Sequence, residues 1–185
     1  AFFQKDPQML MTHPRDDINS IADMKGHPIM ISDSTVNSFW VWLKAKYQFS
    51  DAQIRKYTFN MAPFLVDKNS IQQGFVSSEP KLVMDQGVEP EIYLLADAGW
   101  PSYSTMALVA QHWIDNKPEV VQAFVNASIE GWYDYLYSDP TPANHLIKQD
   151  NPEMNDETIA FGIEKMKQFG IVDSGDAQTL GLGGM

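Results

Sequence analysis

Short apolar runs alternate with helix-like segments between residues 27 and 97, and this alternation limits the fold more than any other feature of the sequence. The runs are too short for helices, and polar turns separate them from segments whose apolar residues recur at helical spacing. Strands that alternate with helices in this way form a mostly parallel sheet covered on both faces. The sequence therefore predicts an α/β fold. Its expected strands lie within 27–32, 51–60, 71–78 and 91–97, and its expected helices within 32–47, 62–68 and 79–87.

Two further extended segments flank this region, and the C-terminal part of the chain changes character. Residues 7–13 and residues 103–110 each read as a short strand. Residues 117–138 have a proline near their start and a continuous apolar stripe, which is typical of a long amphipathic helix. We expect two shorter helical segments after it, at 141–150 and 155–170.

The charge and the residue types exclude several classes of function. Thirteen basic and 24 acidic side chains give a formal net charge of −11, which repels phosphate backbones, so we expect no nucleic-acid partner. The sequence has no cysteine, and therefore no disulfide, thiolate zinc site or cysteine nucleophile. The first residues also lack the basic flank and apolar region of a signal peptide. We expect that the signal of an exported protein would lie outside this chain.

Catalytic signals are weak. The four histidines lie in different elements, and none has the i, i+4 partner that lets two imidazoles share a metal. No G-x-S-x-G motif places a serine nucleophile, and the neighbouring Asp16 and Asp17 are typical of solvated loop charge. The glycine-rich run at 181–184 follows no convincing strand, so it is a weak phosphate cradle. The sequence predicts a binding protein with no catalytic residue, no metal and no cofactor.

Three loops carry aromatic or hydrogen-bonding side chains where predicted strands end, at 32–35, 72–80 and 97–105. In open α/β sheets, ligands sit at the carboxyl ends of the strands. We therefore expect a ligand site built from these loops. Each residue also has a purely structural interpretation: Ser34 as a helix cap, Glu79 as a helix-start charge and Trp100 as a cover over the core.

Trp40 and Trp42 are about 200° apart on a helix of 3.6 residues per turn, so they do not share a face. Trp42 lies on the same side as Phe39, which predicts that it packs in the core. The same geometry predicts that Trp40 points elsewhere, as a candidate wall of a ligand cleft.

Five segments in order resemble the periplasmic substrate-binding proteins of bacterial ABC importers. The group they are most similar to is the thiamine-pyrimidine-synthase-like family, whose relatives bind nitrate, sulfonates, taurine, thiamine pyrimidines and riboflavin. The resemblance implies a type II periplasmic-binding-protein-like fold with two α/β lobes, and a solute held between the lobes for delivery to a membrane permease. It also implies a periplasmic or otherwise exported, membrane-associated protein. The segments are FFQKDPQMLMTHP, IADMKGHPIMIS, NSIQQGFVSSEPKLVMDQG, YLLADAGWPSYST and KPEVVQAFVNASIEGWYDYL.

The resemblance also implies a division of the chain. Residues 1–24 resemble the end of a first lobe and the approach to a hinge, and residues 25–102 resemble a second lobe. Residues 103–185 resemble a return strand and helices that pack on the first lobe. Because family members have a longer first lobe, we expect this chain to be a fragment of a larger protein. Apolar helix faces left open in such a fragment would favour a dimer or a swap.

Family roles carried onto matching positions imply a set of ligand contacts. The loop at 32–35 would supply donors, the segment at 74–80 a serine and an acid, and the segment at 99–105 two aromatic rings. Several aromatic rings with one acid favour a flat heteroaromatic solute, such as a pyrimidine or a flavin, over bare nitrate. The implied contacts are Ser34, Thr35, Trp40, Ser78, Glu79, Trp100 and Tyr103.

Other functions of the same fold stay open at this point. The solute could be nitrate, a sulfonate or taurine. Fungal relatives are enzymes that make the thiamine pyrimidine from a histidine and a bound cofactor, and that activity accompanies a cysteine-rich motif absent from this sequence. A ligand-sensing domain would report solute occupancy to a partner other than a permease.

Overall fold

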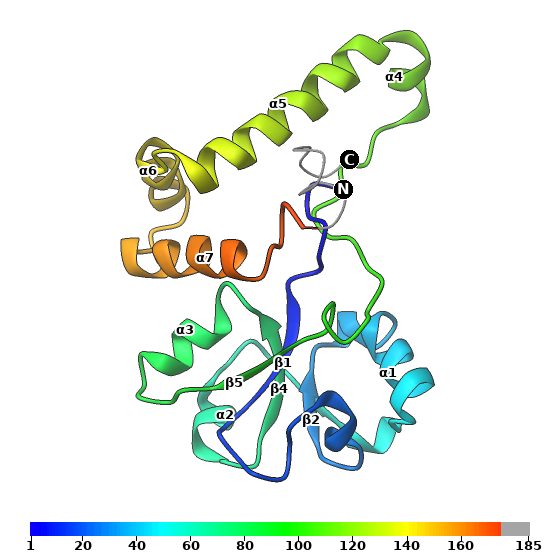
Figure 1. Cartoon of the computed structure of the whole chain (residues 1–185), viewed down its shortest axis with the longest axis vertical. Coiled ribbons are helices and arrows are strands. Elements are labelled where there is room, and N and C mark those ends of the chain that lie inside the picture. Colours follow the sequence, from blue (N-terminus) through cyan, green and yellow to red (C-terminus); the bar gives the residue numbers. More distant parts are fainter. Residues whose placement is uncertain (175–185) are drawn as a thin grey trace. The chain divides into compact units, whose positions relative to one another are not determined.

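The computed structural model describes residues 1–174, which form two compact units (Figure 1). The sheet unit is Pro7–Pro101, and the helical unit comprises Ala1–Asp6 and the described residues 102–174. The glycine-rich run at 181–184 lies outside the described residues. Residues 7–24 belong to the sheet unit, because the first strand pairs with two later strands.

The sheet unit is built on five strands in the order β3-β2-β4-β1-β5. The strand β2 pairs in parallel with β3 and β4, whereas β1 pairs antiparallel with β4 and β5. Four strands therefore run in one direction and β1 alone is reversed, which confirms the predicted α/β class. The strands are β1 Gln8–Thr12, β2 Ile29–Ile31, β3 Ile54–Lys56, β4 Ile71–Phe75 and β5 Glu91–Leu94.

Helices cover both faces of this sheet (Figure 1). On one face α1 packs on β1, β2 and β4 around a fully buried core, and on the other face Glu79 of α3 lies against Gly74 of β4. The left-handed backbone of Gln48 ends α1, and its N–H bonds to the carbonyl of Lys44. The helical elements are η1 Ile21–Met24, η2 Asp33–Thr35, α1 Phe39–Tyr47, η3 Asp51–Gln53, α2 Ala62–Val66 and α3 Glu79–Met84.

The prediction for the two tryptophans is wrong. Trp40 is 0% exposed and lies in the core, where its indole N–H donates to Asp51 Oδ1 at 2.9 Å. Trp42 is only partly buried and packs at the margin of that core. The buried positions of α1 are Phe39, Trp40 and Leu43, so the centre of the buried face lies between the first two. Phe39 marked one border of that face, not its centre.

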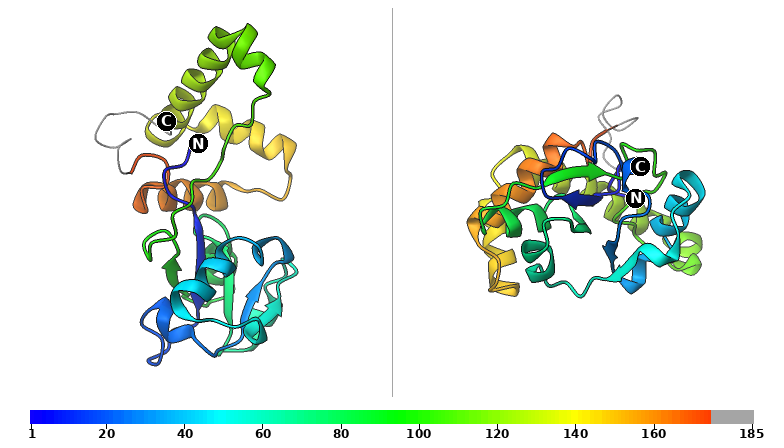
Figure 2. Two further views of the ribbon diagram at one scale, coloured as in Figure 1. Left: turned by 90° about the vertical axis from the view of Figure 1, so that its right-hand side faces the viewer. Right: turned by 90° about the horizontal axis from the view of Figure 1, so that it is seen from below.

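The helical unit contains the three helices expected after residue 117, with one shorter helix before them (Figure 2). The Asn155 side chain caps the last helix by accepting the N–H of Thr158 at 2.8 Å. Few of the described side chains of the helical unit are buried, and Phe124 is 56% exposed. The helices are α4 Gln111–Asn116, α5 Pro118–Tyr137, α6 Thr141–Asp150 and α7 Asp156–Gln168.

The strand expected at 103–110 does not form. Of these residues only Ser104 makes a β-bridge, with Phe3, and Leu108 is fully exposed. Beyond Thr105, whose carbonyl accepts the N–H of Phe2, the apolar run meets no strand among residues 1–174, so its local β-propensity is not enough to form a strand.

Candidate functional site

The carboxyl ends of β2, β3, β4 and β5 meet at one edge of the sheet, because these four strands share a direction. We call this the carboxyl-end edge. The segments that leave the strands there are Ser32–Thr35, Tyr57, Val76–Glu79 and the chain from Leu95 to Trp100. Two of the three predicted loops thus come together within the sheet unit. The third is divided, because the sheet unit ends at Pro101.

A buried glutamine joins the first loop to β4. Gln73 is 6% exposed, and its Oε1 accepts the backbone N–H of Ser32 at 2.7 Å and the hydroxyl of Thr35 at 2.6 Å. Its Nε2 lies 3.3 Å from Ser32 Oγ, which in turn lies 2.9 Å from Oγ of the exposed Ser34. The hydroxyl of Thr35 is therefore engaged inside the unit, whereas Ser34 reaches solvent.

Sequence reasoning missed Gln73. A glutamine inside a strand has no pattern that identifies its partner, and Ser32 lies 41 residues away. The available signal is the pair Gln72 and Gln73 in the middle of a strand whose neighbours indicate burial, because buried polar side chains need partners.

A second polar network lies on the other face of β4 around Glu79. One carboxylate oxygen accepts the backbone N–H of Phe75 at 2.8 Å and the hydroxyl of Ser78, and the other accepts the Tyr57 hydroxyl at 3.4 Å. Gly74 provides the room for this side chain, since a Cβ there would lie 2.9 Å from Glu79 Cβ. Burial of Tyr57, together with the negative charge of Glu79, raises the pKa of the Tyr57 phenol far above its ordinary value. Glu79 thus fixes the turn that presents Ser78.

The predicted aromatic contacts lie in different places. Trp100 is partly buried and packs against the core of the sheet unit. The centroid of its ring lies 5.6 Å from that of the Trp42 ring. Trp40 is wholly inside that core. Tyr103 is an exposed ring of the helical unit, and its contact with a solute stays a prediction.

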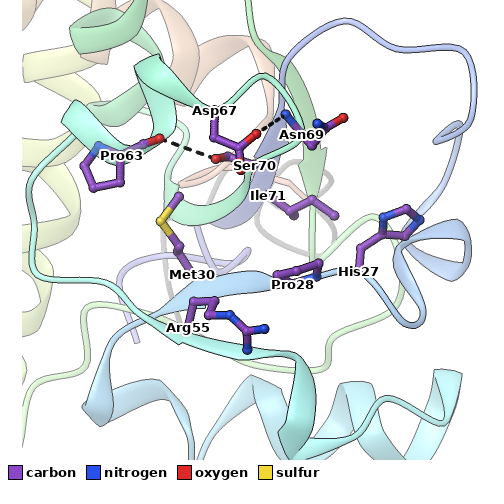
Figure 3. A pocket seen from close by; sticks show the side chains of 9 residues that line it. All are labelled: His27, Pro28, Met30, Arg55, Pro63, Asp67, Asn69, Ser70 and Ile71. Carbon is purple, nitrogen blue, oxygen red and sulfur yellow. Dashed lines mark hydrogen bonds between the residues drawn. The ribbon is translucent and has the colours of Figure 1, made fainter.

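A hollow of about 330 Å³ lies at the opposite ends of the strands (Figure 3). Pro28 precedes β2 and Ser70 precedes β4, and both line it together with Met30 and Arg55. One guanidinium nitrogen of Arg55 is already held by the carbonyls of Ala52 and Ile54. Because it lies where β2 and β4 begin, the hollow is separate from the carboxyl-end edge. No sequence pattern predicted it.

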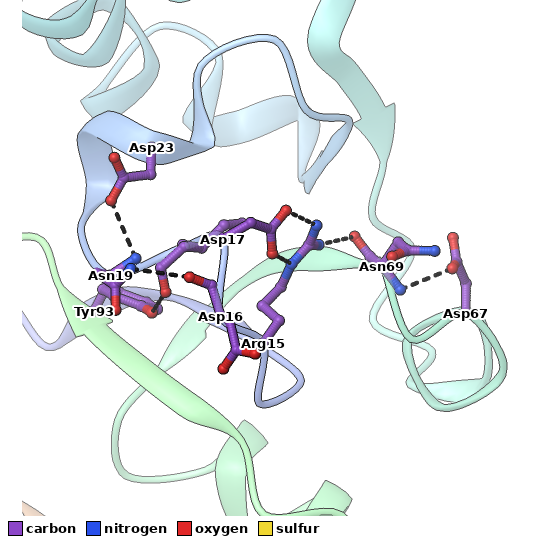
Figure 4. Close-up of polar contacts among 9 residues, drawn as sticks. Arg15, Asp16, Asp17, Asn19, Asp23, Asp67, Asn69 and Tyr93 are labelled. Atoms are coloured by element: carbon purple, nitrogen blue, oxygen red, sulfur yellow. Dashed lines mark hydrogen bonds and ion pairs between the residues drawn. The ribbon is translucent and has the colours of Figure 1, made fainter.

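The loop after β1 is held by a bidentate ion pair (Figure 4). Arg15 donates from Nε and Nη2 to the two carboxylate oxygens of Asp17, each at 2.6 Å, and from Nη1 to the carbonyl of Asn69 at 3.1 Å. The hydrogen bond from Arg15 lowers the pKa of the Asp17 carboxyl. These contacts tie two loops together, which is a structural role.

No three His, Asp or Glu side chains of residues 1–174 gather as ligands for a metal ion. Over the same residues, no helix has both the length and the apolar character needed to cross a membrane.

A protein family described as NMT1/THI5 like matches residues 1–143 of the sequence. The riboflavin-binding protein RibY of Chloroflexus aurantiacus is 30% identical over 158 residues, which are 83% of this chain and 44% of RibY. The crystal structure of the periplasmic aliphatic sulphonate binding protein SsuA from Escherichia coli matches with a TM-score of 0.65 at 13% identity. That match covers 86% of this chain and 52% of SsuA, and it shows the fold alone. The chain thus spans about half the length of these relatives.

Proposed function

Because the chain belongs to the NMT1/THI5-like family, we propose that it is part of the solute-binding component of an ABC importer. The observation that carries the proposal is the carboxyl-end edge, where two hydrogen-bonded loops present hydroxyl groups on a rigid sheet. Ligands of open α/β sheets bind at such edges. The protein would capture a small solute outside the cytoplasm and deliver it to a membrane permease.

Within the sheet unit, we assign direct contact with the solute to Ser34 and Ser78. Ser34 is exposed, and Ser78 is partly buried at the start of α3. Glu79 holds Ser78 in place by accepting its hydroxyl proton, which leaves the lone pairs of that oxygen for the solute. Thr35 holds the first loop on Gln73. Trp100 would offer the edge of a ring beside the same strand ends.

The proposed solute is a flat heteroaromatic molecule, of the flavin or pyrimidine type. Two observations support this class: the relative RibY is named as a riboflavin-binding protein, and aromatic side chains flank the strand ends. Stacking on an aromatic ring adds about 0.5–1.5 kcal/mol beyond the burial of area. No cofactor and no catalytic step enters this proposal.

A binding panel tests the proposal on the full-length protein. Thermal unfolding is measured with riboflavin, an aminopyrimidine, taurine and nitrate, and small molecules released from the denatured protein are identified by mass spectrometry. Stabilisation by a heterocycle supports the proposed class. Stabilisation by taurine or nitrate alone refutes the class, and the absence of any bound or stabilising solute refutes the binding function.

A second experiment addresses delivery. Cells that lack the protein should lose uptake of the solute that stabilises it, while uptake of an unrelated solute continues. Unchanged uptake, with loss of a response to that solute, would favour the sensing function instead.

A further inference from the structure

We propose that Gln73 fixes the direction of a hydroxyl chain so that Ser34 offers its O–H outward and selects solutes with a hydrogen-bond acceptor at that point. The inference rests on the proposed function and specifies the chemistry of its site. It makes Gln73 a positioning residue, because its side chain is buried and acts through Ser32 and Ser34.

The orientation of the Gln73 amide follows from a donor that has no alternative. The backbone N–H of Ser32 can only donate, so the amide atom 2.7 Å from it must be the oxygen. The same oxygen takes the hydroxyl proton of Thr35, whose other acceptor is the Ser32 carbonyl at 2.8 Å. The opposite end of the amide is then Nε2, a group that donates and does not accept.

The direction of the chain follows from that orientation. Ser32 Oγ lies 3.3 Å from Nε2, so the Ser32 hydroxyl is the acceptor on that side and its single proton points elsewhere. Its nearest hydroxyl neighbour is Ser34 Oγ at 2.9 Å, while Thr35 Oγ1 is 3.4 Å away. Ser34 thus accepts from Ser32. Among residues 1–174 Ser34 Oγ has no second hydrogen-bond partner, so its own proton is left for a ligand.

An outward O–H discriminates between solutes by the group that faces it. A ring carbonyl, a ring nitrogen with a free lone pair or a sulfonate oxygen accepts the proton. An ammonium or a ring N–H meets a second donor instead, and two facing donors leave both without a partner, which costs binding energy. Thr35 offers the solute no proton, because its hydroxyl donates inside the unit, so the selection rests on Ser34.

Replacing Gln73 by glutamate reverses the chain with almost no change in shape. A carboxylate accepts at both oxygens, so Ser32 would donate to it and turn its lone pairs toward Ser34. The Ser34 proton would then point inward to Ser32 Oγ. Three donors around the carboxylate favour its ionised form, which keeps the reversal in place.

The test measures riboflavin affinity of the full-length protein by quenching of flavin fluorescence in four variants. Gln73→Glu should bind about tenfold more weakly, the loss of one good hydrogen bond. Gln72→Glu is the matched control, because it adds the same charge one residue away on the other face of β4 and should change affinity far less. In a Ser34→Ala background, Gln73→Glu should have no further effect.

The outcomes separate the inference from the function on which it rests. If wild-type protein binds riboflavin and Gln73→Glu weakens binding equally with and without the Ser34 hydroxyl, the inferred direction of the hydroxyl chain is refuted. The binding function then stands. If the wild type binds no solute of the panel, the binding function fails and the inference fails with it. Should Gln73→Glu not fold, Ser32→Ala removes the same link. It should also weaken binding several-fold, and unchanged affinity would overturn the inference.

Discussion

Removing the Glu79 side chain tests whether this acid organises the carboxyl-end edge or only touches a solute. Its carboxylate accepts the Phe75 N–H and the Ser78 hydroxyl at short distances, and the Tyr57 hydroxyl at 3.4 Å. Hydrogen bonds to a charged group contribute about 1.5–3 kcal/mol each. When the acid is gone, water reaches part of the turn and replaces some of these hydrogen bonds, so the net loss is smaller than their sum. We therefore expect Glu79→Ala to lower the free energy of unfolding by about 3 kcal/mol.

Glu79→Gln is the matched variant, because it keeps the shape and one acceptor. Its oxygen can still accept from Phe75 and Ser78, and its amide can donate to the Tyr57 oxygen, so we expect a loss of only about 1 kcal/mol. Urea unfolding followed by circular dichroism measures both values. Equal losses for the two variants, or no loss in either, would contradict the structural role of Glu79. Lost solute binding at unchanged stability would instead make it a direct contact.

Three further predictions concern packing and charge in the two units. Trp40→Phe should cost about 2–3 kcal/mol in urea unfolding, because it empties part of the core and leaves Asp51 without the indole donor. Gly74→Ala should cost about 1–3 kcal/mol, since its Cβ would lie under 3 Å from neighbouring side chains, whereas Gly131→Ala in α5 meets nothing within 4 Å and should be neutral or stabilising. Hydrogen bonds from Lys44 and the indole lower the pKa of Asp51, so its contribution is complete above the ordinary value of 3.8 and is lost as the pH falls through the lowered pKa. Unfolding midpoints between pH 5 and pH 2 should therefore fall less steeply in Asp51→Asn than in the wild type, and equal slopes would contradict this.

The fold class and most elements could be predicted from periodicity, because short apolar runs and helical stripes are local patterns. The reversed direction of β1 could not, since direction is set by pairing with β4 and β5, which come much later in the chain. The expected strand at 103–110 failed for the same reason: a strand needs a partner. The family was recognisable from the order of its motifs, and the match over residues 1–143 confirms it.

The candidate site was predictable as a set of loops and not as a set of contacts. The loops at 32–35 and 72–80 meet as expected, because strands of one direction end at one edge. Which hydroxyls are free depends on partners distant in sequence, above all Gln73. The burial of Trp40 depends on the side of Phe39 to which the buried face of α1 extends, and the position of Phe39 alone does not determine that side.

Mapping of amide chemical shifts during titration with riboflavin tests the central claim most directly. The account predicts that the backbone signals of Ser32–Thr35 and of Ser78 shift with the added solute, while those of His27–Met30 at the opposite strand ends do not. Shifts confined to His27–Met30 and Arg55 would place the solute in the hollow of Figure 3, and would contradict binding at the carboxyl-end edge.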